Sequence, residues 1–232
     1  MAHIFRFFLP PDVATASAAQ VTLAAVDAKR LHKVLRLEVG EVVEVADGTG
    51  RVFMATVEDS KGGKLLLGKE SAPQPELAPI RVLLAQSGPR ADDAVEKLVE
   101  LGVSVIGPLL AVGRRREART DRWERIAAAA AAQAKLPKIP AILAPVALTD
   151  ALHAGAVLLS HEEADSALDT ALTGAGLPVT LLIGPEAGFA VTELALARAA
   201  GVPIVSLGPT ILRTETAAVV AAAVVLDRIG QS

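Results

Sequence analysis

The residues best suited to chemistry lie in two glycine turns near the carboxyl end of the sequence. Segment 184–188 reads Gly-Pro-Glu-Ala-Gly and follows the apolar run 179–183, and Gly208-Pro209 follows the run 203–207. Both runs are short and rich in apolar and β-branched residues, as buried strands are, and glycine lets the backbone turn sharply after each of them. Open α/β sheets bind ligands at the carboxyl ends of their parallel strands, so the two turns predict a ligand site.

The sequences of the two turns exclude two common nucleotide-binding loops. A loop for a nucleoside triphosphate ends in Gly-Lys-Ser/Thr, and a dinucleotide-binding turn reads G-x-G-x-x-G at the start of a helix. Neither pattern follows either strand. A helix is expected after each turn, with Thr192 as the cap of helix 193–200 and Thr214 as the cap of the apolar run 217–226.

Composition narrows the class of protein further. The 232 residues are 52% apolar, enough for a sizeable core in one large or two modest domains. There is no cysteine, and the four histidines have no metal-ligand spacing, so we expect no disulfide and no metal site. No run of about 18 apolar residues predicts a membrane span. We therefore expect a cytoplasmic protein without a membrane partner.

The positive charge is concentrated in one segment, although the formal net charge is −3. Residues 114–138 carry eight basic and three acidic side chains. The basic ones are Arg114, Arg115, Arg116, Arg119, Arg122, Arg125, Lys135 and Lys138. Such a local excess attracts phosphate even on an acidic protein, which favours RNA as a partner. The alternative is a solvated helix whose charges pair three or four residues apart.

The elements that must position the glycine turns fall into two predicted domains. Short strands at 4–9, 42–46, 51–58 and 64–69, with one helix at 25–34, predict a small β-barrel in residues 1–71. Three prolines near residues 72–79 indicate a linker. Residues 80–232 then alternate strands and helices, which predicts an α/β domain with a mainly parallel, doubly wound sheet. Its further strands are expected at 80–85, 103–106 and 156–160, and its further helices at 92–101, 121–134 and 165–172.

The two glycine turns also resemble the carboxyl-terminal signature of a known superfamily, the SPOUT methyltransferases. The matching residues are Ile183, Gly184, Pro185, Glu186, Gly188, Phe189, Glu193, Leu207, Gly208, Ile211, Leu212, Arg213, Glu215, Thr216 and Ala217. Within that superfamily they resemble the RsmE-type family, which methylates N3 of a uridine in 16S ribosomal RNA. Looser matches extend the resemblance over residues 3–226, including Arg6-Phe7-Phe8 and the segment 96–103.

The resemblance implies a fold, a cofactor and partners. The amino-terminal barrel would be PUA-like, and the α/β domain would be a SPOUT domain whose last helix, 214–229, completes a trefoil knot. The cofactor would be S-adenosylmethionine, the substrate 16S ribosomal RNA or the small ribosomal subunit, and the assembly a homodimer. The cofactor would be held by Ile183, Gly184, Pro185, Gly188, Leu207, Gly208, Ile211, Leu212 and Thr216.

The resemblance also implies catalytic roles near the turns. Because N3 of uridine carries a proton at neutral pH, the reaction needs a proton acceptor and a group that stabilises negative charge on the base. Arg213 is the candidate for the second role, and Glu215 or Glu186 for the first, directly or through water. For the two glutamates the alternative is structural, either a buried pair with an arginine or a helix cap that fixes the loops.

RNA contacts are expected on both domains. The candidates are Arg6, Lys33, Arg36, Arg114, Arg115, Arg116 and Lys138. For Arg6 and Arg36 the alternative is a structural ion pair across the barrel.

Three positions depart from the family pattern: Ala187 replaces a glycine, and Thr210 and Leu136 replace arginines. A Cβ at residue 187 would be costly if that position needed a positive φ. Two other functions therefore stay open: another SPOUT enzyme acting on a ribose or a guanine of transfer RNA, and an RNA-binding homologue without catalysis.

Overall fold

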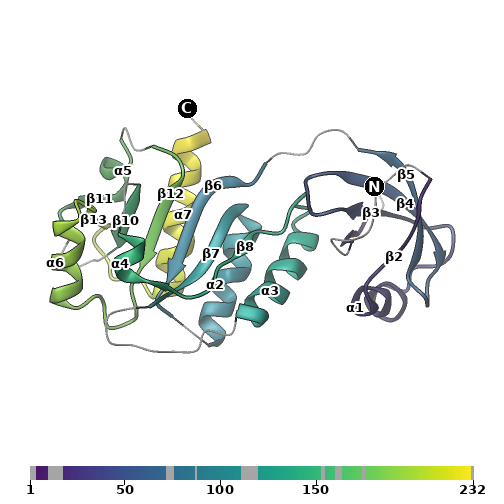
Figure 1. The fold of residues 1–232 in the computed structure, drawn as a ribbon, viewed down its shortest axis with the longest axis horizontal. Helices are drawn as coiled ribbons and strands as arrows, with labels where there is room; N and C mark the ends of the chain where they lie inside the picture. Colours follow the sequence, from purple (N-terminus) through teal and green to yellow (C-terminus); the bar gives the residue numbers. More distant parts are fainter. Residues whose placement is uncertain are drawn as a thin grey trace. The chain divides into compact units, whose positions relative to one another are not determined.

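The computed structural model describes residues 4–9, 18–71, 76–86, 88–110, 120–152, 155–159, 164–173 and 176–230. The chain divides into two compact units (Figure 1). The first comprises Met1–Glu76 with Ala128–Ile139, and the second comprises Leu77–Ala127 with Pro140–Ser232.

The first unit is built on a five-stranded sheet in the order β1-β3-β4-β5-β2. Its strands are β1 (Arg6–Phe8), β2 (Gln20–Thr22), β3 (Val42–Ala46), β4 (Val52–Asp59) and β5 (Lys64–Glu70). Only the β1 pairing with β3 is parallel among the described strands of this sheet. Helix α1 (Ala25–Lys29) continues directly into the π-helical turn η1 (Arg30–Val34). Leu31 of this turn enters a core with Phe7, Phe53 and Leu65.

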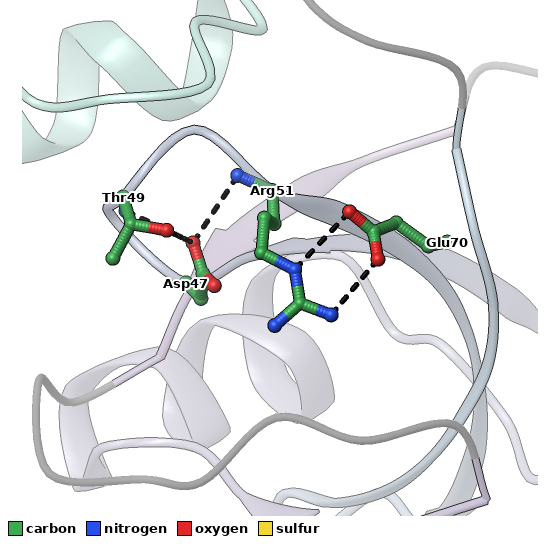
Figure 2. Close-up of polar contacts among 4 residues, drawn as sticks. All are labelled: Asp47, Thr49, Arg51 and Glu70. Carbon is green, nitrogen blue, oxygen red and sulfur yellow. Dashed lines mark hydrogen bonds and ion pairs between the residues drawn. The ribbon is translucent and has the colours of Figure 1, made fainter.

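The turn between β3 and β4 is fixed by a short polar network (Figure 2). Asp47 Oδ1 accepts hydrogen bonds from the backbone N–H of Thr49 at 2.9 Å and from its hydroxyl at 2.8 Å. The guanidinium of Arg51 donates two bonds to Glu70, at 3.1 and 2.8 Å, and its Cζ lies 4.8 Å from the centre of the Phe53 ring. The hydrogen bond from Arg51 lowers the pKa of Glu70 below its ordinary value. The Arg51–Glu70 ion pair therefore joins the residue before β4 to the last residue of β5.

The second unit contains an eight-stranded sheet in the order β11-β13-β10-β12-β6-β7-β8, with β9 paired to β7. The strands are β6 (Ala78–Leu84), β7 (Val103–Leu110), β8 (Ala141–Ile142), β9 (Val146–Ala147), β10 (Ala156–Leu159), β11 (Ser166–Ala167), β12 (Val179–Ile183) and β13 (Ile204–Ser206). Every pairing between these described strands is parallel. The prediction of an α/β fold with a mainly parallel sheet is confirmed.

The helices of the second unit are α2 (Pro89–Glu100), α4 (Leu148–Ala151), α5 (Leu168–Ala171), α6 (Val191–Ala199) and α7 (Thr214–Gly230). Helix α3 (Thr120–Gln133) begins in this unit, and its residues from Ala128 onward belong to the first. Helix α7 runs along β6 and β12 and packs against α2 (Figure 1). Its core residues are mostly alanines, which lets helix and sheet approach closely. No described helix is long and apolar enough to cross a membrane.

Local expectations differ from the structure in several places. The predicted helix at 165–172 is the two-residue strand β11 followed by one helical turn, and the short elements β2, β8, β9 and α4 were missed.

Thr192 does not cap α6, because it lies inside the first turn of that helix. Instead the buried carboxylate of Glu193 accepts the Ala190 N–H at 2.7 Å, which satisfies a free donor at the helix start. Thr214 is likewise not a cap but the first residue of α7.

Candidate functional site

A cavity of about 550 Å³ lies at the carboxyl ends of β12 and β13. Its wall is formed by 183–189 after β12, by 205–207 at the end of β13, by 210–214 and Ala217 at the start of α7, and by Arg90 of α2. The neighbouring strands β12 and β6 are in register, with Ile183 opposite Leu84. The chain therefore brings both glycine turns and the segment after β6 to one edge of the sheet.

The structure places most of the predicted cofactor residues in this wall. Ile183, Gly184, Pro185, Gly188, Leu207, Ile211 and Leu212 all line the cavity. Gly208 lies in the second turn but does not line the cavity. Its φ of +129° is a conformation that residues with side chains rarely adopt. Thr216 does not line the cavity and is exposed on α7.

Two glycines of the first turn are needed for different reasons. A Cβ on Gly184 would lie 2.8 Å from Cε2 of Phe189, a buried ring that also lines the cavity. Gly188 has open space around it but a φ of +72°. Ala187 is absent from the described residues with positive φ, so the Cβ that departs from the family pattern meets no backbone strain.

The first turn is tied to α7 by one hydrogen bond. The buried Thr214 hydroxyl donates to the carbonyl oxygen of Gly184 at 3.1 Å. Because α7 begins at Thr214, this bond fixes the start of the helix against the turn. The two glycine turns are thus positioned as one structure.

Arg90, Glu186 and Arg213 line the cavity, whereas the predicted catalytic Glu215 does not line it but is paired with Arg90. Arg90 forms an ion pair with Glu186 and a longer one, at 3.9 Å, between its Nε and Glu215 Oε1. Gln86 Nε2 lies 3.4 Å from the other carboxylate oxygen of Glu215. Arg213 is exposed in the cavity wall and forms no ion pair or side-chain hydrogen bond with the described part of the chain. Arg213 is therefore the cation available to a ligand.

Sequence reasoning did not identify Arg90 and Gln86 as site residues. Arg90 is 96 residues from Glu186 in the sequence, and neither residue stands in a signature motif. A usable signal was nevertheless present, because both follow the carboxyl end of a predicted strand, the same edge that indicated the glycine turns.

The predicted RNA-binding residues lie in different environments. Arg6 is 3% exposed, bonded to Glu44 at 3.1 Å and to the carbonyl oxygen of Lys135, which favours the structural alternative for this residue. Lys33 and Arg36 are exposed, and Arg36 has a φ of +54°. Lys138 pairs with Glu76 at 2.6 Å. Arg114, Arg115 and Arg116 lie outside the described residues.

Residues 76–226 match the sequence model of the family described as RNA methyltransferase domain. The chain is 33% identical over 219 residues to ribosomal RNA small subunit methyltransferase E of a Synechocystis species, covering 88% of this chain and 72% of that protein. It is 34% identical over 208 residues to the protein of the same name from Mycobacterium bovis, covering 81% and 79%. The chain belongs to the ribosomal RNA small subunit methyltransferase E family.

Solved structures agree with this assignment. A ribosomal RNA small subunit methyltransferase E from Neisseria gonorrhoeae, bound to S-adenosylmethionine, superposes with a TM-score of 0.86 at 27% identity, over 97% of this chain and 98% of that one. A methyltransferase from Legionella pneumophila with bound S-adenosylmethionine gives a TM-score of 0.85 at 26% identity and covers 98% of both chains. The expected family is therefore confirmed.

Proposed function

We propose that the protein transfers a methyl group from S-adenosylmethionine to N3 of a uridine in 16S ribosomal RNA. The observation that carries the proposal is the cavity built from both family turns, with an unpaired arginine in its wall. Family membership supports the cofactor and the ribosomal RNA substrate. The uridine N3 specificity is supported by the resemblance of the two turns to that enzyme type.

The cavity fits S-adenosylmethionine in size and in chemistry. Its volume of about 550 Å³ falls within the range of small-molecule sites. Gly184 and Gly188 would present backbone amides and carbonyls to adenosine, with Ile183, Pro185, Leu207, Ile211 and Leu212 around it. Gly208 would shape the second turn through its backbone conformation, and Thr216 lies outside the cavity wall. When bound, the sulfonium supplies the electrophilic methyl group.

The side chains of this chain then have two tasks. Arg213 lies in the wall with its guanidinium free, so it stabilises the negative charge that spreads over the uracil oxygens as N3 loses its proton. Glu215 or Glu186 accepts that proton, directly or through water. The cavity wall would hold donor and acceptor in line, which is the main requirement of an in-line methyl transfer.

RNA would be gripped by exposed cations outside the cavity. Lys33 and Arg36 on the first unit have exposed side chains that form no ion pair with the described residues. The local charge excess of the sequence adds four further candidates for RNA contacts, Arg114, Arg115, Arg116 and Lys138. Replacing Lys33 by Ala and Arg36 by Asn, which tolerates positive φ, should lower the log-log salt slope of RNA binding by about 0.7 to 0.9 for each lost phosphate contact. An unchanged slope would remove these two residues from the interface.

We extend the proposal to the organisation of the chain. Residues 1–71 form a PUA-like RNA-binding barrel, 72–79 a linker, and 80–232 a SPOUT domain whose carboxyl-terminal helix completes a trefoil knot. Support comes from the packing of α7 against β6, β12 and α2 and from its bond to the first turn. Helix α7 is apolar on nearly every side, yet Val219, Val220 and Val224 remain only half-buried. An apolar helix of this kind is normally covered, which supports a homodimer.

Cofactor binding and product analysis together test the function. A ligand at 100 times its dissociation constant stabilises a protein by about 2.7 kcal/mol, so saturating S-adenosylmethionine should raise Tm by several degrees. Small subunits from a deletion strain should then accept one methyl group at N3 of one uridine, located by mass spectrometry of the ribosomal RNA. Absence of any thermal shift removes the methyltransferase assignment. A shift without methylation of small subunits points to the non-catalytic homologue, and methylation of transfer RNA points to another enzyme of the superfamily.

A further inference from the structure

Arg90 enters the site from a part of the chain that the family signature does not cover. Gly88, with a φ of +89°, turns the chain after β6, and α2 begins at Pro89. Arg90 therefore stands in the first turn of α2, at the same sheet edge as the glycine turns. Its half-exposed side chain lines the cavity and meets two carboxylates, Glu186 from the first turn and Glu215 from α7.

Glu215 is held from two sides. Its Oε1 faces Arg90 Nε at 3.9 Å, and its Oε2 accepts from Gln86 Nε2 at 3.4 Å. Gln86 makes this contact although its own Oε1 is buried and has no hydrogen-bond partner among the described residues. The opposite amide orientation would turn the carbonyl oxygen toward the carboxylate, which is repulsive. The Glu215 side chain is 20% exposed against 57% for Glu186, so Glu215 is the more buried of the two.

The free arginine of the site stands close to these acids along the chain. Arg213 is two residues before Glu215 and shares the cavity wall with Glu186. A carboxylate attracts a nearby arginine, and this attraction is weaker when another cation already compensates its charge. Arg90 forms ion pairs with both Glu186 and Glu215, and Arg213 forms no ion pair with the described residues.

We propose that Arg90 is a positioning residue that holds Glu186 and Glu215 in place and thereby leaves the Arg213 guanidinium free for the substrate. This role rests on the proposed function, since Arg213 matters only if charge develops on a bound base. It also explains why α2 carries a cation toward a site otherwise made by the carboxyl-terminal turns. Cofactor contacts made by backbone groups of the glycine turns do not depend on Arg90.

The role predicts a loss of turnover with little loss of cofactor affinity. Arg90→Met should lower the single-turnover rate on small ribosomal subunits by about tenfold to hundredfold, the scale of a misplaced catalytic group. Its Kd for S-adenosylmethionine should stay within about threefold of the unmodified protein, because backbone groups make those contacts. Arg90→Lys, which keeps the charge, should recover part of the rate. Arg198→Met is the matched control, because Arg198 is also a half-exposed helix arginine paired with an acid, Asp165, away from the cavity.

Double variants test whether Arg90 acts through the acids. In Glu186→Gln and Glu215→Gln backgrounds the Arg90→Met change should have a smaller effect than in the unmodified protein, since the group it positions is gone. An equal effect in both backgrounds, or an Arg90→Met protein with the full rate, would overturn the proposal while leaving the methyltransferase function intact. An inactive unmodified protein with no cofactor binding would instead refute the proposed function itself.

Discussion

Gly184 is the position where a single methyl group should do most damage to the site. Replacing Gly184 by Ala puts a Cβ 2.8 Å from Cε2 and 2.9 Å from Cδ2 of the Phe189 ring. Carbon atoms in contact prefer about 3.5 to 4.0 Å, so the ring has to move by roughly 0.7 Å or more. Phe189 is only 8% exposed and packs in a core cluster with Leu182 and Leu194, which leaves it little room.

The expected cost follows from overpacking. Forcing extra carbon into a packed core costs about 1 to 3 kcal/mol, which for a chain of this length lowers Tm by about 2 to 12 °C. Because Gly184 and Phe189 both line the cavity, the displaced ring should also weaken the thermal shift caused by S-adenosylmethionine. Thermal unfolding with and without the cofactor measures both effects.

Two further variants make this reasoning refutable. Gly176→Ala is the matched control, since a Cβ there meets nothing within 4 Å and the glycine has no positive φ, so Tm should be unchanged or slightly raised. Adding Phe189→Leu to Gly184→Ala removes the ring that clashes, and the double variant should be no less stable than Phe189→Leu alone. A Gly184→Ala protein with unchanged Tm, or stability losses that simply add, would show that the predicted contact does not limit the site.

Three other changes probe separate parts of the structure. Gly208→Val should abolish the cofactor-induced shift and lower stability by about 1 to 3 kcal/mol, because its φ of +129° disfavours any side chain although space is open around it; an unchanged cofactor-induced shift would contradict this. Thr214→Val should lower stability by about 0.5 to 1.5 kcal/mol by removing the hydrogen bond to the half-buried Gly184 carbonyl, whereas Thr214→Ser should not; equal effects by urea unfolding would refute the role of the hydroxyl. Arg51 lowers the pKa of Glu70, so this pair stabilises the protein above the ordinary pKa of glutamate, about 4.3, and the stabilisation is lost as pH falls through the lowered pKa. Glu70→Gln should therefore weaken the fall of stability with decreasing pH, and an unchanged fall would refute this.

Local sequence signals were sufficient where one short segment determines its own structure. The apolar runs 179–183 and 203–207 gave strands β12 and β13 within a few residues. Each is followed by a glycine that the structure requires, Gly184 because the Phe189 ring lies close and Gly208 because its φ is positive. The order of β12 beside β6 could not be read locally, because it depends on pairing between segments about 100 residues apart. That pairing, with Ala85 N–H bonded to the Ile183 carbonyl at 2.9 Å, is what brings Gln86 and Arg90 to the site.

Burial was equally invisible to local reasoning. Arg6 and Arg36 were equivalent as candidates, yet Arg6 lies in the sheet of the first unit with Glu44 as its partner, while Arg36 is exposed. The difference arises from the register of β1 with β3, which places Arg6 opposite Glu44. A charged residue next to aromatic positions in a strand is therefore ambiguous until its cross-strand neighbour is known. The length of α5 was also not readable from the sequence, since a helix was expected at 165–172 and only one helical turn forms.

The departures from the family pattern bear on charge more than on backbone. Ala187 is exposed and has no positive φ, so it leaves the first turn unstrained. Thr210, the second departure from the family pattern, lies in the cavity wall and offers a hydroxyl there. Of the two arginines that do line the described cavity, Arg90 is already engaged by Glu186 and Glu215. Under the proposed function, we therefore expect charge stabilisation at the substrate base from Arg213 alone among the described lining residues, and turnover should depend on that side chain remaining unpaired.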